Sequence, residues 1–458
     1  MLRRFFASMA TAGLVLGLVN QAYGQSESGS AEIGRIRDAE IEGYLTKWAT
    51  PVWQAAGLDP QQVQIVIVND KQVNAFVAGG LNMFIYAGLL IQSDSANQVV
   101  GVMAHETGHI AGGHLARMDE AIQNAQIIQI LGLVLGAAAV AASRGQAAGA
   151  GMAGASAGAD VAIKNFLSFS RTQERSADQA ATTFLEASGQ SARGLYEFMQ
   201  KLQKEEFLAA YRQDPYLRTH PLTQDRVDFL AHFLDTSKYS NAPPRPGYAE
   251  EHARMRGKLI GFLWPVERVF RHYKADDNSI EARYARAIAY HRENRDDMAL
   301  KLIDGLIAEH PDDPFYNELK GQFLFEAGKV KEAVAPYEKA NKDLPHNALL
   351  ETELAQVLLE TGDQRYNERA LASLSEAVQR ENDDPLTWRM LAIVYGRQGK
   401  EGETALALAE EFYAEGRYKE ARAEAKRAQQ RLPYGSPGGL RGQDIEQASD
   451  KAIKDAKN

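Results

Sequence analysis

The segment HETGH, residues 105–109, puts two histidines and a glutamate inside the otherwise apolar run VVGVMAHETGHIAGGHLAR. If this run is helical, His105 and His109 lie one turn apart on the same face and can point at a single metal ion. Neutral imidazoles bind zinc well, and zinc lowers the pKa of a coordinated water towards about 7. Glu106 follows the first histidine, so its carboxylate can accept the proton of that water. The pattern predicts a zinc site that hydrolyses amide bonds.

A catalytic zinc site needs a third protein ligand besides these two histidines. His114 is one residue short of the third histidine of the metzincin pattern, which would stand at Leu115. If the helix continues, His114 also lies about 140° around it from His109, off the metal face. We therefore expect His114 to be a surface or structural residue.

A better third ligand lies in the segment SRTQERSADQAA, residues 170–181, where Glu174 and Asp178 are one helical turn apart. Glu174 can complete the zinc site, and Asp178 can accept a hydrogen bond from the second ring nitrogen of a ligating histidine. The alternative is an ordinary surface helix face, because the same segment carries Arg171 and Arg175. The zinc role is the hypothesis carried forward.

Three short segments precede HETGH and predict the sheet that positions it: two are rich in β-branched and aromatic residues, and the one between them ends in a Gly pair, a turn signal. They are QIVIVND (residues 64–70), NAFVAGG (residues 74–80) and FIYAGLLI (residues 84–91). Longer apolar, helix-like segments surround them. The fold class expected here is an α+β domain, mostly helical, with a small sheet packed beside the HETGH helix.

Residues 1–24 have the three parts of a secretory signal peptide. Arg3 and Arg4 form a basic start, an apolar stretch too short to span a bilayer follows, and a small-residue cleavage site ends near Gly24. The chain contains no cysteine, which excludes thiol catalysis, thiolate metal ligands and disulfides. The formal net charge of −9 does not favour binding to the phosphate backbone of a nucleic acid, so no nucleic-acid partner is expected. These features indicate export to a bacterial periplasm.

The rest of the chain divides into four parts by composition and sequence pattern. They are a zinc metallopeptidase domain at residues 30–236, a Pro-rich linker at 237–250, a helical domain at 251–434 and a C-terminal tail at 435–458. In the helical domain, Pro311 and Pro345 are 34 residues apart, and so are Gly328 and Gly362. That period is typical of tetratricopeptide repeats. We expect an all-α solenoid, with a short insertion in QRYNER, whose concave surface binds partners or substrates.

Residues 127–163 form a long run of small and apolar residues. The most apolar piece, Ile127 to Ala142, is 16 residues long and falls short of the ~20 that a spanning helix needs. Two interpretations stay open: a helical hairpin packed against the protein, and a flap that makes peripheral contact with the membrane.

HExxH followed by ExxxD, with NAF upstream and THP downstream, resembles the HtpX and CAAX-prenyl-protease type of gluzincin metallopeptidase. The resemblance covers nearly the whole chain after the signal segment, and the exported form with C-terminal repeats is similar to proteins of Gram-negative bacteria. It implies one zinc ion per chain. The implied ligands are His105, His109 and Glu174, with Glu106 as general base and Asp178 hydrogen-bonded behind a ligand.

The resemblance also gives roles to residues that periodicity alone leaves in loops. His220, in LRTHPLTQDRV, is expected either to close the zinc site as a fourth ligand or to stabilise the oxyanion. Arg226 matches the arginine of the same motif and is expected beside the substrate. The edge strand on which such enzymes bind an extended substrate is matched by Asn74, Ala75 and Phe76.

The implied function is that of a periplasmic zinc endopeptidase in quality control of misfolded or stalled outer-membrane proteins. Its repeat domain would bind polypeptide substrates or the outer-membrane assembly machinery. An alternative from another class is a chaperone or scaffold for outer-membrane protein assembly in which proteolysis is minor. A zinc hydrolase acting on a non-peptide amide is a third possibility, disfavoured by the edge-strand motif. Glu106 separates the first two, because a scaffold would keep its function after Glu106→Gln.

Overall fold

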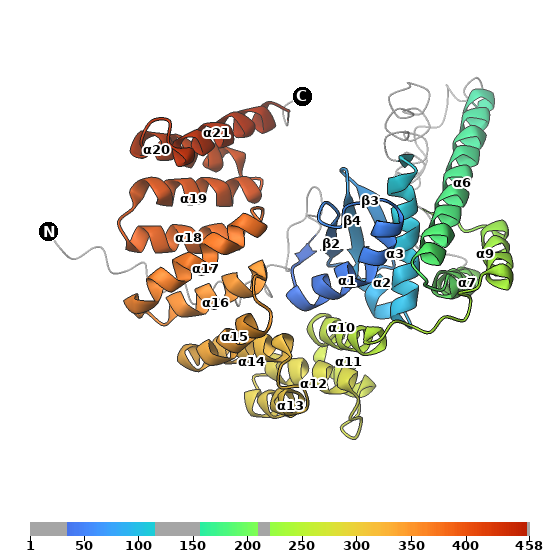
Figure 1. Ribbon diagram of the computed structural model, residues 1–458, viewed down its shortest axis with the longest axis horizontal. Helices are drawn as coiled ribbons and strands as arrows, with labels where there is room; N and C mark the ends of the chain where they lie inside the picture. Colours follow the sequence, from blue (N-terminus) through green and yellow to red (C-terminus); the bar gives the residue numbers. More distant parts are fainter. Residues whose placement is uncertain (1–33, 115–155, 209–219, 456–458) are drawn as a thin grey trace, which may run out of the picture. The chain divides into compact units, whose positions relative to one another are not determined.

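The computed structural model describes residues 34–114, 156–208 and 220–455 (Figure 1). The expected signal peptide, most of residues 127–163 and the motif residue Thr219 lie outside these ranges. The chain forms two compact units. Ile33–Trp264 and Ser279–Ala285 make up the sheet unit, and the repeat unit contains Pro265–Asn278 and Arg286–Asn458.

The sheet unit contains one four-stranded sheet with the strand order β1-β2-β4-β3. The strands are β1 (Arg35–Ile36), β2 (Gln64–Val68), β3 (Ala75–Ala78) and β4 (Asn82–Tyr86). β2 and β4 are parallel, whereas β1 and β3 are antiparallel to their neighbours. The predicted small sheet is therefore confirmed, and β3 is an edge strand of it.

The third predicted strand segment, residues 84–91, changes structure half-way. Its first residues complete β4, and the chain then turns into the short helix α2 (Ala87–Gln92). Gly88 marks the change, because a Cβ at this position would lie 2.2 Å from the carbonyl oxygens of Lys71 and Gln72. The close approach of two backbones, which an apolar pattern does not reveal, converts this half of the expected strand into helix.

The register of β3 decides which backbone groups face its open edge. The Tyr86 N–H donates to the carbonyl of Asn74 at 3.0 Å, and Phe76 is paired with Phe84 two residues further on. Because hydrogen-bonded pairs alternate along an antiparallel ladder, the amide groups of Ala75 and Val77 point away from β4. The edge of the sheet therefore presents donors and acceptors that can pair with another extended chain.

Helix α3 (Ala96–Ala111), which carries HETGH, lies at the centre of the sheet unit. It contacts β3 and four helices: α1 (Ala39–Ala55), α6 (Ser156–Ala187), α7 (Arg193–Leu208) and α10 (Tyr248–Leu263). α9 (Gln224–Thr236) packs in turn on α6 and α7. Ser95 caps the start of α3 by accepting a hydrogen bond from the Gln98 N–H. With neighbours on every side, almost all of α3 up to His109 is buried.

The sheet unit extends beyond the metallopeptidase boundary expected at residue 236. The expected linker is held in place at Ser240, whose carbonyl accepts hydrogen bonds from Ser191 Oγ at 2.7 Å and Arg193 Nε at 3.2 Å. Further on, the buried Glu40 of α1 accepts hydrogen bonds from Arg254 at 2.8 Å and Tyr284 at 2.6 Å. A buried carboxylate requires such partners, so residues expected in the repeat domain belong to the sheet unit.

The repeat unit is helical, and consecutive helices from α13 to α21 pack on one another (Figure 1). Its helices are α11 (Val266–His272), α12 (Ile280–Arg292), α13 (Asp296–Glu309), α14 (Pro314–Glu326), α15 (Val330–Asp343), α16 (Ala348–Glu360), α17 (Asn367–Arg380), α18 (Pro385–Arg397), α19 (Glu401–Ala414), α20 (Tyr418–Arg431) and α21 (Pro437–Asp455). α12 begins within the residues assigned to the sheet unit. This arrangement confirms the all-α solenoid that follows the α+β domain.

Two details of the repeat unit bear on the sequence analysis. The repeated glycines Gly328 and Gly362 lie in turns with left-handed φ angles of 76° and 73°, which explains their spacing. The expected insertion contains a 3₁₀ helix, Gln364–Tyr366. The residues expected to form a tail instead form helix α21, which contacts α19 and α20 and buries Ile445. In the part of the chain that the structure describes, every helix is too short or too polar to cross a bilayer.

Candidate metallopeptidase site

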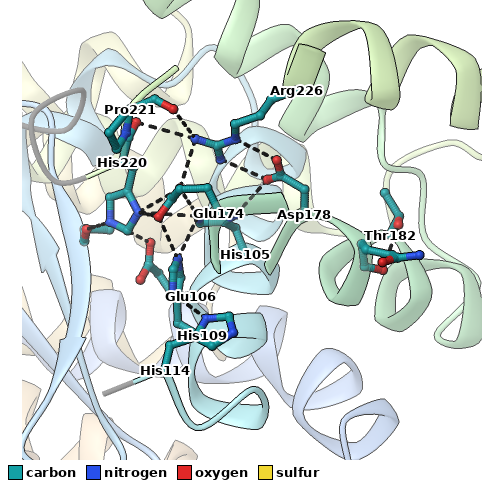
Figure 2. A network of polar contacts seen from close by, with 12 residues as sticks. His105, Glu106, His109, His114, Glu174, Asp178, Thr182, His220, Pro221 and Arg226 are labelled. Atoms are coloured by element: carbon teal, nitrogen blue, oxygen red, sulfur yellow. Dashed lines mark hydrogen bonds and ion pairs between the residues drawn. The ribbon is translucent and has the colours of Figure 1, made fainter. Parts of the chain in front are cut away.

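The site is formed where α3 meets α6. α3 contributes His105, Glu106 and His109, and α6 contributes Glu174 and Asp178 (Figure 2). The helices approach closely because the fourth residue of HETGH is Gly108, where a Cβ would lie 2.6 Å from the carbonyl oxygen of Ala177. The sequence-predicted donors, about 65 residues apart in the chain, are thus brought together by a helix contact that a larger side chain would prevent.

Four side chains converge on one point and form what we call the ligand cluster. Its members are His105 Nε2, His109 Nε2, His220 Nδ1 and the carboxylate oxygens of Glu174. His105 Nε2 lies 3.2 Å from His109 Nε2 and 3.4 Å from His220 Nδ1. The Glu174 oxygens lie 3.3 Å from each of the first two nitrogens and 3.2 Å from the third. All four residues are buried.

These spacings fit a tetrahedral zinc ion. Zinc binds histidine nitrogen and carboxylate oxygen at about 2.0–2.1 Å, so neighbouring donors in a regular tetrahedron are about 3.3–3.4 Å apart. The distances within the cluster, 3.2–3.4 Å, match that edge length. The donors, three imidazoles and one carboxylate, are also of the types that zinc prefers. The residues present therefore fit a zinc ion.

Glu106 supplies a second indication of the same kind. Its carboxylate is fully buried, and neither oxygen has a hydrogen-bond partner among the residues that the structure describes. His220 Nε2 lies 3.6 Å from Glu106 Oε1. A buried carboxylate without partners is costly. Its position beside the cluster is suited to a proton acceptor that is satisfied only when the site is in use.

Asp178 and Arg226 hold the cluster from behind. Asp178 Oδ1 lies 2.8 Å from His105 Nδ1, which leaves Nε2 of that ring to the cluster. Arg226 donates to both oxygens of Asp178, at 2.7 and 2.9 Å, and lies 2.9 Å from Glu174 Oε2. The substrate contact expected of Arg226 stays a prediction. In the structure its guanidinium is buried behind the cluster, with carboxylates as partners.

The electrostatics follow from this packing. Burial alone would lower the pKa of His105, but Asp178 and Glu174 outweigh it and raise that pKa to about 10. Burial also opposes ionisation of Glu174 and Asp178, yet their pKa values are held below the usual range. The causes are the surrounding imidazoles for Glu174 and Arg226 for Asp178. Both carboxylates are therefore anionic and available to a cation.

His220 connects the cluster to the sheet edge. Its Nδ1 belongs to the ligand cluster, while its Nε2 lies 3.3 Å from the carbonyl oxygen of Ala75 on β3. Arg226 fixes the backbone that follows the ring by donating to the carbonyls of His220 and Pro221, at 3.5 and 3.1 Å. One ring nitrogen of His220 thus belongs to the cluster, while the other contacts an outward-facing carbonyl of the edge strand.

The other residues of the NAF motif act through the sheet. Asn74 is buried, and its carbonyl anchors the start of the β3–β4 ladder. The Phe76 ring stacks on Phe84 with a centroid distance of 4.7 Å and lies on the half-exposed face of the sheet. The structure places neither side chain in the ligand cluster. Of the three residues, Ala75 is the one in contact with a cluster member.

His114 differs from its expected position. It is buried, and its Nδ1 lies 3.0 Å from His109 Nδ1. The angular argument assumed a continuing helix, but α3 ends at Ala111 and the chain turns at Gly113, whose φ is +61°. That turn brings the ring back onto the helix, so the surface alternative is wrong and the structural one applies. The paired glycines after HETGH were the available signal.

The comparisons with known proteins agree with this site. Residues 36–233 match the model of peptidase family M48. This match, together with the ligand cluster, identifies the chain as a metalloprotease. All members of the ligand cluster, together with Glu106, Asp178 and Arg226, lie in the matched range. The surface-helix alternative for α6 applies only to its other face, where Arg171 and Arg175 are exposed.

Similar curated proteins extend the match beyond the M48 domain. A beta-barrel assembly-enhancing protease of Yersinia pestis is 26% identical over 389 residues, 81% of this chain and 75% of the relative. The protein of the same name from Escherichia coli (strain K12) is 25% identical over 419 residues, covering 89% and 82%.

Solved structures similar to this chain include two with low scores. One, titled MamA MSR-1 C2, is 20% identical and covers 37% of this chain and 95% of its own, with a TM-score of 0.31. A thermophilic TPR protein of Thermus thermophilus is 18% identical and covers 41% and 99%, with a TM-score of 0.23.

Proposed function

We propose that this metalloprotease is a zinc endopeptidase of the Gram-negative periplasm that cleaves misfolded or stalled outer-membrane proteins. The names of the relatives from Yersinia pestis and Escherichia coli support the link to β-barrel assembly. The signal-like residues 1–24 and the absence of cysteine support an exported protein. The repeat unit supplies a surface for the polypeptide substrate or for the outer-membrane assembly machinery.

The observation that carries the proposal is the four-donor cluster with the unpartnered carboxylate of Glu106 beside it. Zinc, when bound, supplies a Lewis acid that activates water and polarises the scissile carbonyl. Glu106 accepts a proton at a carboxylate oxygen and returns it to the leaving amine. His105, His109 and Glu174 hold the ion, and Asp178 keeps the His105 ring in the orientation this requires.

Three protein ligands leave one position open in a catalytic zinc site, whereas four close it. The position of His220 Nδ1 in the cluster therefore supports a latent state in which this imidazole completes the site. In this state Glu106 faces His220 Nε2, and the imidazole would occupy the position that water or a substrate carbonyl needs. Proteolysis then requires His220 to leave.

The open edge of β3 is the proposed binding place for an extended substrate. The backbone groups of Ala75 and Val77 face outward and can pair with a strand, the mode called β-augmentation. His220 holds the Ala75 carbonyl in the latent state. A substrate strand that takes this acceptor removes one of the two attachments of the ring. Substrate binding is thereby coupled to release of the closed site.

The alternative of a chaperone or scaffold retains one supporting observation, the long repeat unit, which exceeds what peptide-bond hydrolysis requires. The two functions differ in their need for Glu106. A scaffold acts through surface contacts and survives loss of the proton acceptor, whereas a peptidase does not.

The test uses the full-length exported chain, with zinc content and casein hydrolysis measured on the same preparations. Wild type is expected to hold one zinc per chain and to cleave casein. The substitutions are also made in the His220→Ala background, in which the latent state cannot form. Glu106→Gln is expected to keep the zinc and lose cleavage, whereas Glu174→Ala is expected to lose both. Glu197→Gln, an exposed glutamate on α7, is the matched control. Full cleavage by Glu106→Gln, or a full equivalent of zinc in Glu174→Ala, refutes the assignment.

A further inference from the structure

The His109–His114 contact is the one feature around HETGH that the proposed chemistry does not use. The two Nδ1 atoms lie 3.0 Å apart, and the rings meet edge to face with centroids 5.0 Å apart. His114 is 3% exposed, so the contact is shielded from solvent. A buried contact of this length between ring nitrogens is a hydrogen bond in which one ring donates and the other accepts.

The ligand cluster decides the direction of that bond. His109 places its Nε2 in the cluster, so a ring that offers this lone pair to a metal carries its proton on Nδ1. Nδ1–H of His109 then donates to Nδ1 of His114, whose own proton lies on Nε2. In this direction the contact stabilises the tautomer of His109 that can bind a metal through Nε2.

The two histidines of HETGH are consequently supported by different groups. His105 meets the anionic carboxylate of Asp178 at 2.8 Å, whereas His109 meets a second imidazole. The carboxylate pulls harder on the shared proton than a neutral ring does, and so increases the basicity of its histidine more. An imidazole fixes the ring orientation of His109 without adding a further carboxylate to a site that already has Glu106, Glu174 and Asp178.

The chain after α3 is built to bring His114 to this place. Gly113 has a φ of +61°, which reverses the chain directly after the helix. Gly112 leaves room for the returning ring, because a Cβ on it would lie 2.4 Å from His114 Nε2. The segment GGH that follows HETGHIA thus has a physical reason at each position.

We propose that His114 is a positioning residue for the metal site, which orients His109 and fixes its tautomer through the Nδ1–Nδ1 hydrogen bond. The inference rests on the proposed role of His109 as a metal ligand. The proposal assigns a function to the segment after HETGH. It also implies that the two histidine ligands are held by different groups, one by a carboxylate and the other by an imidazole.

The test compares two substitutions of similar size in the full-length protein. In His114→Asn, the amide oxygen takes the place of Nδ1 and still accepts from His109, whereas His114→Leu keeps the volume without an acceptor. Zinc affinity, measured by chelator competition, is expected to fall ~10–100-fold in His114→Leu, as for other hydrogen-bond partners of metal ligands, and much less in His114→Asn. Gly112→Ala, which turns the ring aside, is expected to resemble His114→Leu. His232→Leu, at an exposed position of α9, is the control.

Two spectroscopic measurements make the test independent of activity, and the first of them needs no variant. Nitrogen NMR of wild-type histidines is expected to show a proton on His109 Nδ1 and none on His114 Nδ1. The visible spectrum of bound cobalt is expected to change in His114→Leu and to be restored in His114→Asn.

A proton on His114 Nδ1, or equal zinc affinities in wild type and His114→Leu, overturns the inference. Equal losses in His114→Leu and His114→Asn, with both folded by circular dichroism, also overturn it, because packing alone would then explain them. Failure of wild type to bind zinc instead refutes the proposed function. The two failures are therefore distinguishable.

Discussion

Removal of the Arg226 guanidinium tests how the metal site is held together. Arg226 is the cation between two buried carboxylates, with contacts of 2.7 and 2.9 Å to Asp178 and of 2.9 Å to Glu174. All three side chains are at most 3% exposed. In Arg226→Met the length of the side chain is kept and the charge is lost, which leaves both carboxylates without this partner.

The expected loss is large because the charges are buried. Breaking a buried ion pair by removing one partner costs about 3–5 kcal/mol, most of it the cost of the uncompensated charge. A dication held by Glu174 would offset part of that charge, so the loss is expected to be greatest after treatment with a chelator. Arg175→Met is a matched control, since Arg175 also joins α6 to α9 through Asp225, but with both side chains exposed. An exposed pair contributes only about 0–1 kcal/mol.

The assay is urea unfolding followed by tryptophan fluorescence in a Trp388→Phe background. Trp388 lies in the repeat unit, so the remaining tryptophans, among them the buried Trp48 and Trp53, report on the sheet unit. Adding Asp178→Asn to Arg226→Met is expected to recover part of the lost free energy, because one of the two stranded charges is removed. A loss below about 1 kcal/mol in the metal-free protein, or one no greater than in Arg175→Met, refutes the reasoning.

Two further predictions concern histidines. His220→Ala is expected to keep its zinc and to raise basal peptide hydrolysis, with self-cleavage, because the imidazole that closes the site is gone. A fall of ~10²–10³ in turnover would instead indicate that His220 is an oxyanion donor. An unchanged rate would contradict both roles. Burial lowers the pKa of His252, with help from Arg256, to about 4, so the unfolded chain takes up a proton below about pH 6.5 that the folded chain refuses. The contribution of His252 to the free energy of unfolding is therefore complete above pH 6.5 and is lost as the pH falls to 4, up to about 3 kcal/mol. Urea unfolding at pH 7 and 5 should show that His252→Gln loses less stability on acidification than wild type. Identical losses would refute this prediction.

The sequence by itself determined the parts of the site that depend on local geometry. The spacing of His105 and His109 places both on one helix face, and the same spacing pairs Glu174 with Asp178, whatever surrounds the helices. The Gly pair that ends residues 74–80 and the strand-like segments on both sides likewise indicated a strand, and the 34-residue period indicated the helical repeats. Each of these features depends on the spacing or the type of residues along the chain, and both can be read from the order of residues alone.

Only the tertiary structure decided how these parts meet. The approach of α6 to Gly108, the chain reversal that returns His114 to His109, and the burial of Arg226 between two carboxylates all depend on packing between segments distant in sequence or on a turn. The same holds for α21, whose residues are too polar to be recognised as a packed helix until α19 and α20 are beside them. A one-dimensional pattern records which face of a helix is apolar. The partner of that face, and the ring nitrogen left for the metal, are set by contacts that form only when the chain is folded.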